Sequence, residues 1–129
     1  MAEKKYAKPT EAELEILQVL WEHGPSTVRF VNEFLNSKRE VGYTTTLKVM
    51  QIMHEKGLLK RNTDSRTHIY EAIPEREAIQ RNLLDNFLDN VFSGSAMQLV
   101  VQALGSHKPS AEELGKIKSL IEEIEKQRK

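Results

Sequence analysis

The sequence predicts a mainly α-helical protein with a small β-hairpin: three helices, the hairpin and a helical tail. Apolar residues recur at helical spacing in three segments at the start of the chain. The pattern then changes to strand, polar turn and strand between residues 58 and 73, and Pro74 closes this segment. Beyond it the pattern is helical again, so we expect one domain over residues 1–74 and a second over residues 75–129.

The first helix is predicted to begin after Thr10. Thr10 followed by Glu13 is a capping-box pattern, in which the hydroxyl and the carboxylate each satisfy a backbone N–H. The run His23-Gly24-Pro25 ends the helix. The apolar positions on one side are Leu14, Leu17, Val19, Leu20 and Trp21. We interpret Trp21 as a core residue rather than as a platform for stacking bases.

The second helix is predicted from its cap and its apolar stripe. Either Ser26 or Thr27 can cap it, and the polar stretch of residues 36–42 ends it. Its apolar stripe consists of Val28, Val31, Phe34 and Leu35.

The third helix is predicted from Tyr43 to about Lys56, where Gly57 supplies a left-handed residue. At 100° per residue, one side carries Thr46, Val49, Met50 and Met53. The other side carries Thr44, Lys48, Gln51 and Glu55.

The hairpin is predicted as a strand over residues 58–61, a turn over residues 62–65 and a strand over residues 66–73. Tyr70 lies on an apolar periodic face, so we interpret it as a core residue. Three helices followed by a hairpin with a polar tip is the order of a winged helix, a helix-turn-helix with an added β-wing. The predicted fold class is therefore a winged helix-turn-helix domain followed by a helical tail.

The tail is rich in apolar residues for its size, with a helix-capping pattern at Ser110 and Glu113. A segment this short buries so many apolar side chains most readily against a second copy of itself. We therefore expect the tail to be a dimerisation domain. The candidate dimerisation residues are Phe87, Leu88, Val91, Phe92, Leu99, Val100 and Leu104.

Composition excludes several classes of function. The 129 residues contain no cysteine, which excludes disulfides, thiolate metal sites and cysteine nucleophiles. The four histidines have no metal-binding spacing, and no phosphate loop, nucleophile elbow or carboxylate pair is visible. We expect neither an enzyme nor a cofactor or metal. The absence of a long apolar run and of an apolar leader predicts a cytoplasmic protein without membrane insertion.

The net charge is zero, but the charges are unevenly distributed. Residues 10–25 carry four glutamates and no Lys or Arg, whereas residues 38–66 carry seven basic groups against three acidic ones. One stretch of the first domain is thus acidic and another is basic. This distribution is compatible with DNA binding but does not require it.

The third helix is the main functional candidate, as a helix that enters the major groove of DNA. Its outer side offers hydrogen-bonding groups and positive charge to bases and phosphates. The candidate residues are Thr44, Thr45, Lys48 and Gln51, with Leu47 and Ile52 beside them for thymine methyl groups. The alternative is an ordinary solvated face, and the strand–turn–strand that follows favours the DNA-binding interpretation.

Arg66 in the hairpin is a further DNA-binding candidate. It is placed to reach a phosphate or the minor groove, and the alternative is an ordinary solvated charge. For the domain as a whole, the alternative function is a winged helix that binds another protein without contacting DNA directly, which the neutral net charge would suit.

The sequence resembles the family of penicillinase and methicillin-resistance repressors, which also includes copper-responsive repressors. The resemblance covers nearly the whole chain. It is carried by the order and spacing of five segments: Glu13–Trp21, Gly24–Val28, Tyr43–Thr45, Glu55–Leu59 and Arg66–Tyr70.

The resemblance implies a homodimer that binds double-stranded operator DNA at an inverted repeat and represses transcription until an inducing signal lowers its affinity. It also implies a link to antibiotic resistance. In β-lactam-responsive members, a membrane-bound sensor protease system triggers cleavage in the dimerisation half, typically between Asn and Phe. The matching segment here is Leu99–Leu104, with Gln102-Ala103 at the scissile position. The cysteine cluster of the copper-responsive members is absent.

Overall fold

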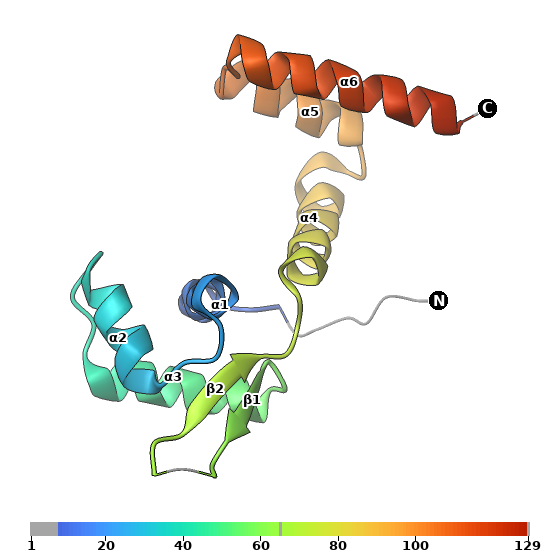
Figure 1. Ribbon diagram of the computed structural model, residues 1–129. Coiled ribbons are helices and arrows are strands. Elements are labelled where there is room, and N and C mark those ends of the chain that lie inside the picture. Colours follow the sequence, from blue (N-terminus) through green and yellow to red (C-terminus); the bar gives the residue numbers. More distant parts are fainter. Residues whose placement is uncertain (1–7, 65, 129) are drawn as a thin grey trace. The chain divides into compact units, whose positions relative to one another are not determined.

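The protein is described here by a computed structural model, which covers residues 8–64 and 66–128 (Figure 1). In chain order the elements are α1 (Glu11–His23), α2 (Val28–Asn36), α3 (Tyr43–Glu55), β1 (Leu59–Asn62), β2 (Ile69–Ala72), α4 (Arg76–Phe92), α5 (Ala96–Ser106) and α6 (Ala111–Gln127). This order confirms the predicted winged helix with a helical tail.

Side-chain caps fix where the first two helices begin. At α1 the Thr10 hydroxyl accepts a hydrogen bond from the Glu13 N–H, and the Glu13 carboxylate accepts one from the Thr10 N–H, which confirms the predicted capping box. At α2 it is Thr27 that caps, accepting from the Phe30 N–H. The Ser26 backbone instead pairs with β2.

The wing is an antiparallel pair, with Leu59 opposite Ala72 and Asn62 opposite Ile69. Ser26 adds one bridge to it: its N–H donates to the Tyr70 carbonyl at 3.0 Å and its carbonyl accepts from the Tyr70 N–H at 2.8 Å. These bonds tie the start of α2 to the wing. Gly57 at φ +81° turns the chain from α3 into the hairpin, as predicted.

The second strand of the hairpin is shorter than the sequence predicts, whereas the first has the predicted length but lies one residue later, at Leu59–Asn62. The predicted second strand begins at Arg66, whereas β2 begins at Ile69. Pairing ends at Asn62 opposite Ile69, so the segment between them is a loop that includes Arg66. Ser65, which belongs to the predicted turn, lies outside the described residues.

The core of the winged helix is formed by one apolar cluster from α1, α2, α3 and the wing. Its members are Ile16, Leu17, Val19, Leu20, Val28, Val31, Leu35, Met50, Met53, Leu58, Leu59 and Tyr70. Trp21 packs against this cluster, and its indole N–H donates to the Pro74 carbonyl at 2.9 Å. The interpretation of Trp21 and Tyr70 as core residues is confirmed.

The chain divides into two compact units, the first ending at Asp85 and the second beginning at Asn86. The first turns of α4 therefore belong to the winged-helix unit, where Ile79 is buried and Arg76 lies over the Trp21 ring. The domain junction near Pro74 stays a prediction.

The second unit contains the end of α4, then α5 and α6. Ser93 and Gly94, both at positive φ, end α4, and Ser95 caps α5. Helix α5 ends at Ser106, and the predicted capping box of Ser110 and Glu113 opens α6. Neither Ala96–Ser106 nor Ala111–Gln127 contains a buried residue.

Candidate nucleic-acid interface

The outer face of α3 carries the polar residues that the sequence singles out. Thr44, Thr45, Lys48 and Gln51 are all exposed, on two consecutive turns of one helix. Ile52 beside them is 40% exposed. The opposite side of α3 is buried at Thr46, Met50 and Met53, so the helix is held by its inner face while its outer face stays in solvent.

A surface groove lies between α3, the start of α2 and the wing, with a volume of about 570 Å³. It is lined by Thr27, Val28, Arg29, Tyr43, Leu47, Arg66, Thr67, His68 and Tyr70. The groove thus brings together two of the predicted site residues, Leu47 from α3 and Arg66 from the wing loop. Leu47 also packs against the core, so it is half-buried. Arg29 and Tyr43 join this surface without having been predicted as site residues.

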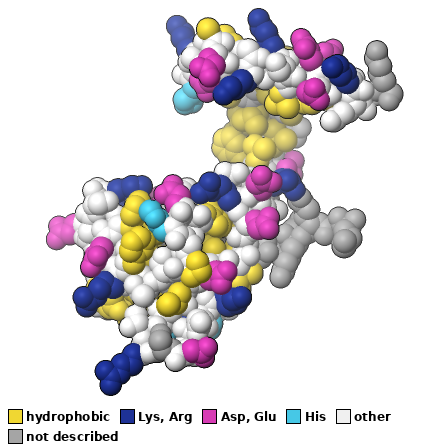
Figure 2. All heavy atoms as spheres, viewed as in Figure 1, with side chains coloured by type: hydrophobic (Ala, Val, Ile, Leu, Met, Phe, Trp, Pro, Cys, Tyr) yellow, Lys and Arg dark blue, Asp and Glu magenta, His cyan; other side chains and the backbone are white. Residues whose placement is uncertain are grey.

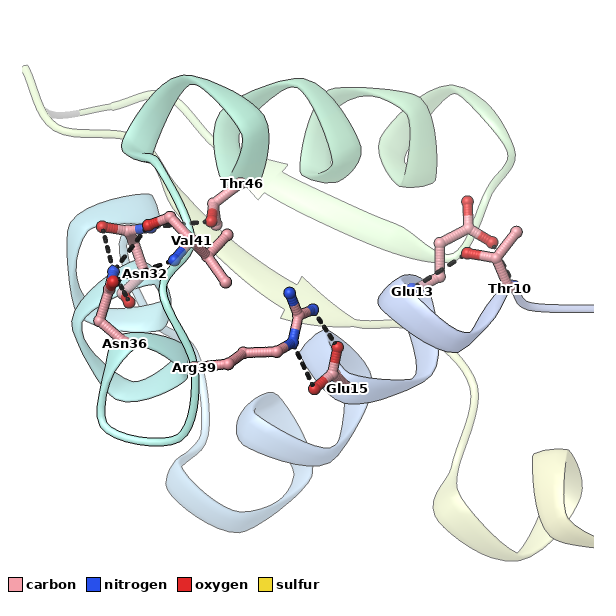
Figure 3. Close-up of polar contacts among 8 residues, drawn as sticks. All are labelled: Thr10, Glu13, Glu15, Asn32, Asn36, Arg39, Val41 and Thr46. Atoms are coloured by element: carbon pink, nitrogen blue, oxygen red, sulfur yellow. Dashed lines mark hydrogen bonds and ion pairs between the residues drawn. The ribbon is translucent and has the colours of Figure 1, made fainter.

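Two basic residues of the positively charged segment 38–66 form ion pairs with glutamates of α1. Arg39 contacts both carboxylate oxygens of Glu15 (Figure 3). Lys56 Nζ lies 2.8 Å from Glu13 Oε1 and 3.1 Å from Oε2. The acidic and basic stretches therefore partly neutralise each other within the fold, and Lys48 and Arg66 remain exposed on the outer surface. Figure 2 shows a basic side chain projecting at the tip of the wing.

Glu13 is a buried carboxylate with a structural role. Burial by itself raises the pKa of this carboxyl, but hydrogen bonds from Lys56 and from the Thr10 N–H outweigh it. The pKa of Glu13 consequently lies below its ordinary value. The charged form of Glu13 joins the start of α1 to the end of α3.

Two asparagines of α2 hold the segment that leads into α3, as Figure 3 shows. Asn32 Nδ2 donates to the Val41 carbonyl and to Thr46 Oγ1, each at 2.9 Å. Asn36 Nδ2 also donates to the Val41 carbonyl, at 2.8 Å, and Asn36 Oδ1 accepts from the Val41 N–H at 3.0 Å. Sequence reasoning missed both asparagines. Their spacing of four residues on the polar side of α2 was the available signal.

The candidate dimerisation and cleavage-site residues of the tail are exposed or half-buried in the single chain. Phe87, Val91 and Val100 are 49%, 58% and 48% exposed, and Figure 2 shows hydrophobic side chains gathered over α4. The remaining candidates Leu88, Phe92, Leu99 and Leu104 are half-buried. Gln102 and Ala103 are both exposed, and the bond between them lies inside α5.

The described residues contain no group of three His, Asp or Glu side chains that could hold a metal ion. Across that same part of the chain, none of the helices has the length and apolar character needed to cross a membrane.

The buried inner face and polar outer face of α3, with the wing beside it, define a winged-helix DNA-binding protein. Residues 9–123 match the family model described as the penicillinase repressor. The chain belongs to the penicillinase repressor family, so it is a DNA-binding transcriptional repressor and not an enzyme.

Relatives match along most of the chain. The transcriptional regulator BlaI of Mycobacterium tuberculosis is 28% identical over 123 residues, which cover 94% of this chain and 88% of that protein. The penicillinase repressor of Bacillus licheniformis is 27% identical over 128 residues, 98% of each chain.

A solved structure supports the winged-helix fold. The solution structure of the DNA-binding domain of the repressor BlaI aligns with a TM-score of 0.51 and 22% identity. The alignment covers 59% of this chain and 93% of that one.

Proposed function

We propose that this repressor is a homodimer that binds an inverted-repeat operator, with α3 of each protomer in a major groove. The observation that carries the proposal is the exposed polar face of α3. Hydroxyl and amide groups at Thr44, Thr45 and Gln51 offer donors and acceptors to base edges. Lys48 on the same face offers a positive charge to a phosphate or to a guanine.

The wing contacts the DNA backbone beside α3 in this proposal. Arg66 lies in the loop at the end of the hairpin and lines the groove that α3 and α2 also border. Arg29 lines the same groove, so a phosphate held there would be attracted by two positive charges. Leu47 and Ile52, at the edge of the α3 face, are suited to apolar contact with thymine methyl groups.

The tail joins two protomers and thereby sets the spacing of the two half-sites. The support is the apolar surface on α4, α5 and α6, which one chain leaves in solvent. An exposed apolar surface of this extent marks an interaction site. A homodimer also matches the two-fold symmetry of an inverted repeat.

Induction acts on the tail in this proposal. Cleavage between Gln102 and Ala103 would divide α5 and separate α6 from the rest of the interface, and two half-site readers would lose the gain of bivalent binding. A membrane-bound sensor protease system of the kind that the family resemblance implies would supply the signal. The repressor itself acts in the cytoplasm, where operator DNA lies.

A gel-shift titration against the DNA upstream of the protein's own gene tests the proposal. The expected result is a specific complex with an inverted repeat, whose affinity falls log-linearly with salt as counterions are released. Duplexes carrying one half-site should bind far more weakly than the full repeat. A protein that bound no DNA, or whose binding did not respond to salt, would instead fit the protein-interaction alternative, and the proposal would be wrong.

A further inference from the structure

We propose that the side-chain amides of Asn32 and Asn36 position α3 for reading bases, acting as a clamp on the segment that enters the helix. Both residues belong to α2, and both contact the backbone of Val41, immediately before the N-cap Gly42. They are positioning residues in this proposal, because they touch the reading helix and not the DNA. The inference rests on the proposed function, in which α3 is the reader.

The clamp occupies the Val41 peptide groups on both sides. The Val41 carbonyl accepts from both amides, and the Val41 N–H donates to Asn36 Oδ1. The two side chains also orient each other, because Asn36 Nδ2 lies 3.2 Å from Asn32 Oδ1. These hydrogen bonds together direct the amide nitrogen of each asparagine at the Val41 carbonyl (Figure 3).

A second contact ties the clamp to α3 itself. Asn32 Nδ2 donates to Thr46 Oγ1, and Thr46 is 1% exposed in the first turns of α3. Gly42 has no side chain with which to cap this helix. The position of the start of α3 along α2 is thus set by amides from the neighbouring helix instead of by a cap of its own.

Base reading depends on such positioning more than phosphate contact does. A hydrogen bond to a base edge requires heavy-atom distances within a few tenths of an ångström and a nearly linear angle. Attraction between a side-chain cation and a phosphate changes slowly with distance. Loosening the clamp should therefore weaken binding to the operator while leaving binding to unrelated DNA almost unchanged.

The test uses the full chain with Thr46→Val and Thr46→Ser, and measures affinity for the operator and for an unrelated duplex at several salt concentrations. Thr46→Val retains the side-chain volume but removes the acceptor for Asn32, whereas Thr46→Ser retains the hydroxyl and removes a methyl group. We expect Thr46→Val to lose about tenfold in operator affinity, comparable with one hydrogen bond. The affinity of Thr46→Val for unrelated DNA should stay within twofold of the parent, and the salt dependence of its binding should be unchanged. Thr46→Ser should keep the parent's affinity for both duplexes.

Asn36→Ala provides a second variant, because Asn36 is exposed and its truncation leaves the core intact. It should show the same selective loss, whereas Ser37→Ala, which removes a bond to the Phe34 carbonyl only, should not. If circular dichroism finds Thr46→Val unfolded, Asn36→Ala decides the question. Equal losses on both duplexes, or no loss on the operator, would overturn the clamp.

Lys48→Ala and Gln51→Ala in the same assay separate the two proposals. If these variants weaken operator binding and the clamp variants do not, the clamp alone is wrong. If they leave operator binding intact in a folded protein, α3 is not the reader, and the proposed function fails together with the clamp.

Discussion

Lys48 and Gln51 lie on the same exposed face of α3, one turn apart, but should support DNA binding by different physical means. A lysine that contacts a phosphate releases a counterion, so Lys48→Ala should weaken binding to all sequences and reduce the salt slope by about one. If Lys48 contacts a guanine instead, the loss should be about 1–3 kcal/mol and confined to one base position. Gln51→Ala should act in this second way only, because an uncharged amide releases no counterion. Gel shifts at several salt concentrations, with operator variants at each base, measure both effects.

The controls for these variants are a matched lysine and a matched glutamine outside the proposed interface. Lys108 lies in the loop before α6 and Gln18 on the outer side of α1, and both are exposed. Their alanine variants should retain operator affinity. Glu15 is unsuitable as a control, because removing its carboxylate would release Arg39 from its ion pair. Equal effects of the Lys108 and Lys48 changes would argue for a general charge effect and against a contact at α3.

Glu13 should make the stability of the winged helix depend on pH. The pKa of Glu13 is lowered in the folded chain. The stability that the charged carboxylate contributes is therefore fully present at pH values above the ordinary pKa of a glutamate. That contribution is lost as the pH falls through the lowered pKa. Glu13→Gln should reduce the free energy of unfolding at neutral pH by about 1.5–3 kcal/mol, the value of a hydrogen bond to a charged group. The free energy of unfolding of Glu13→Gln should also decrease less steeply than that of the parent as the pH falls into the acid range.

Urea unfolding of the parent and of Glu13→Gln between neutral and acid pH checks this. Glu15→Gln is the matched control: the Glu15–Arg39 pair is largely exposed, and exposed pairs contribute about 0–1 kcal/mol. If Glu13→Gln had the same acid limb as the parent, the ion pair with Lys56 would not be a source of stability.

The Gln102–Ala103 bond lies inside α5, where the helical backbone protects it from proteolysis. A protease site needs extended backbone, so cleavage requires that α5 first unwind locally. Glycine in a helix interior costs about 1 kcal/mol relative to alanine. Ala103→Gly should therefore raise the population of the open form, and with it the rate of cutting there, about fivefold.

Limited proteolysis with a protease of broad specificity, followed by mass spectrometry, measures this rate. Ala111→Gly at the start of α6 makes the same chemical change in the next helix and should leave cutting in α5 unchanged. A parent protein that is cut at this bond as fast as the Ala103→Gly variant would mean that α5 is already open in solution.

The elements that could be predicted from sequence are those whose signals are local. The capping box of Thr10 and Glu13 and the left-handed turn at Gly57 involve residues adjacent along the chain, and the structure has both. The predicted second strand is too long because Arg66, Thr67 and His68, which precede the paired residues, include none of the turn-forming residue types that would mark the boundary. Strand length is set by the partner strand, which ends at Asn62.

Within the candidate site, helical periodicity predicts the exposed face of α3, but it does not predict the ion pairs and hydrogen bonds that hold the ends of this helix in place. Arg39 reaches a residue 24 positions away, and Lys56 one 43 positions away. Counting charges by segment cannot reveal that glutamates of α1 pair with Arg39, which precedes α3 in the chain, and with Lys56, which follows it. The asparagine clamp likewise depends on the packing of α2 against α3, which periodicity alone does not fix.

The second unit of the molecule carries an apolar surface that a single chain leaves exposed. Val91 on α4 and Leu120 on α6 are 58% and 59% exposed, so each leaves most of its apolar surface in solvent in the single chain. A homodimer would bury them in an interface of roughly 2,000 Å² or more, as stable dimers of this kind do. A charge placed at either position should therefore damage assembly and leave each protomer folded.

Val91→Glu and Leu120→Glu should convert the proposed dimer of 14.8 kDa chains into monomers, because an interface that covers these positions would have to bury an unpaired carboxylate. Sedimentation equilibrium measures the mass, and circular dichroism should find unchanged helix content. Operator affinity should fall by about 10²–10⁴, the gain of linking two binding modules, while affinity for a single half-site stays the same. Asn90→Glu, beside Val91 at an exposed polar position, is the matched control and should remain dimeric. If both charged variants sedimented as dimers with full operator affinity, the tail would not be the dimerisation element, and the two half-site readers would be joined elsewhere.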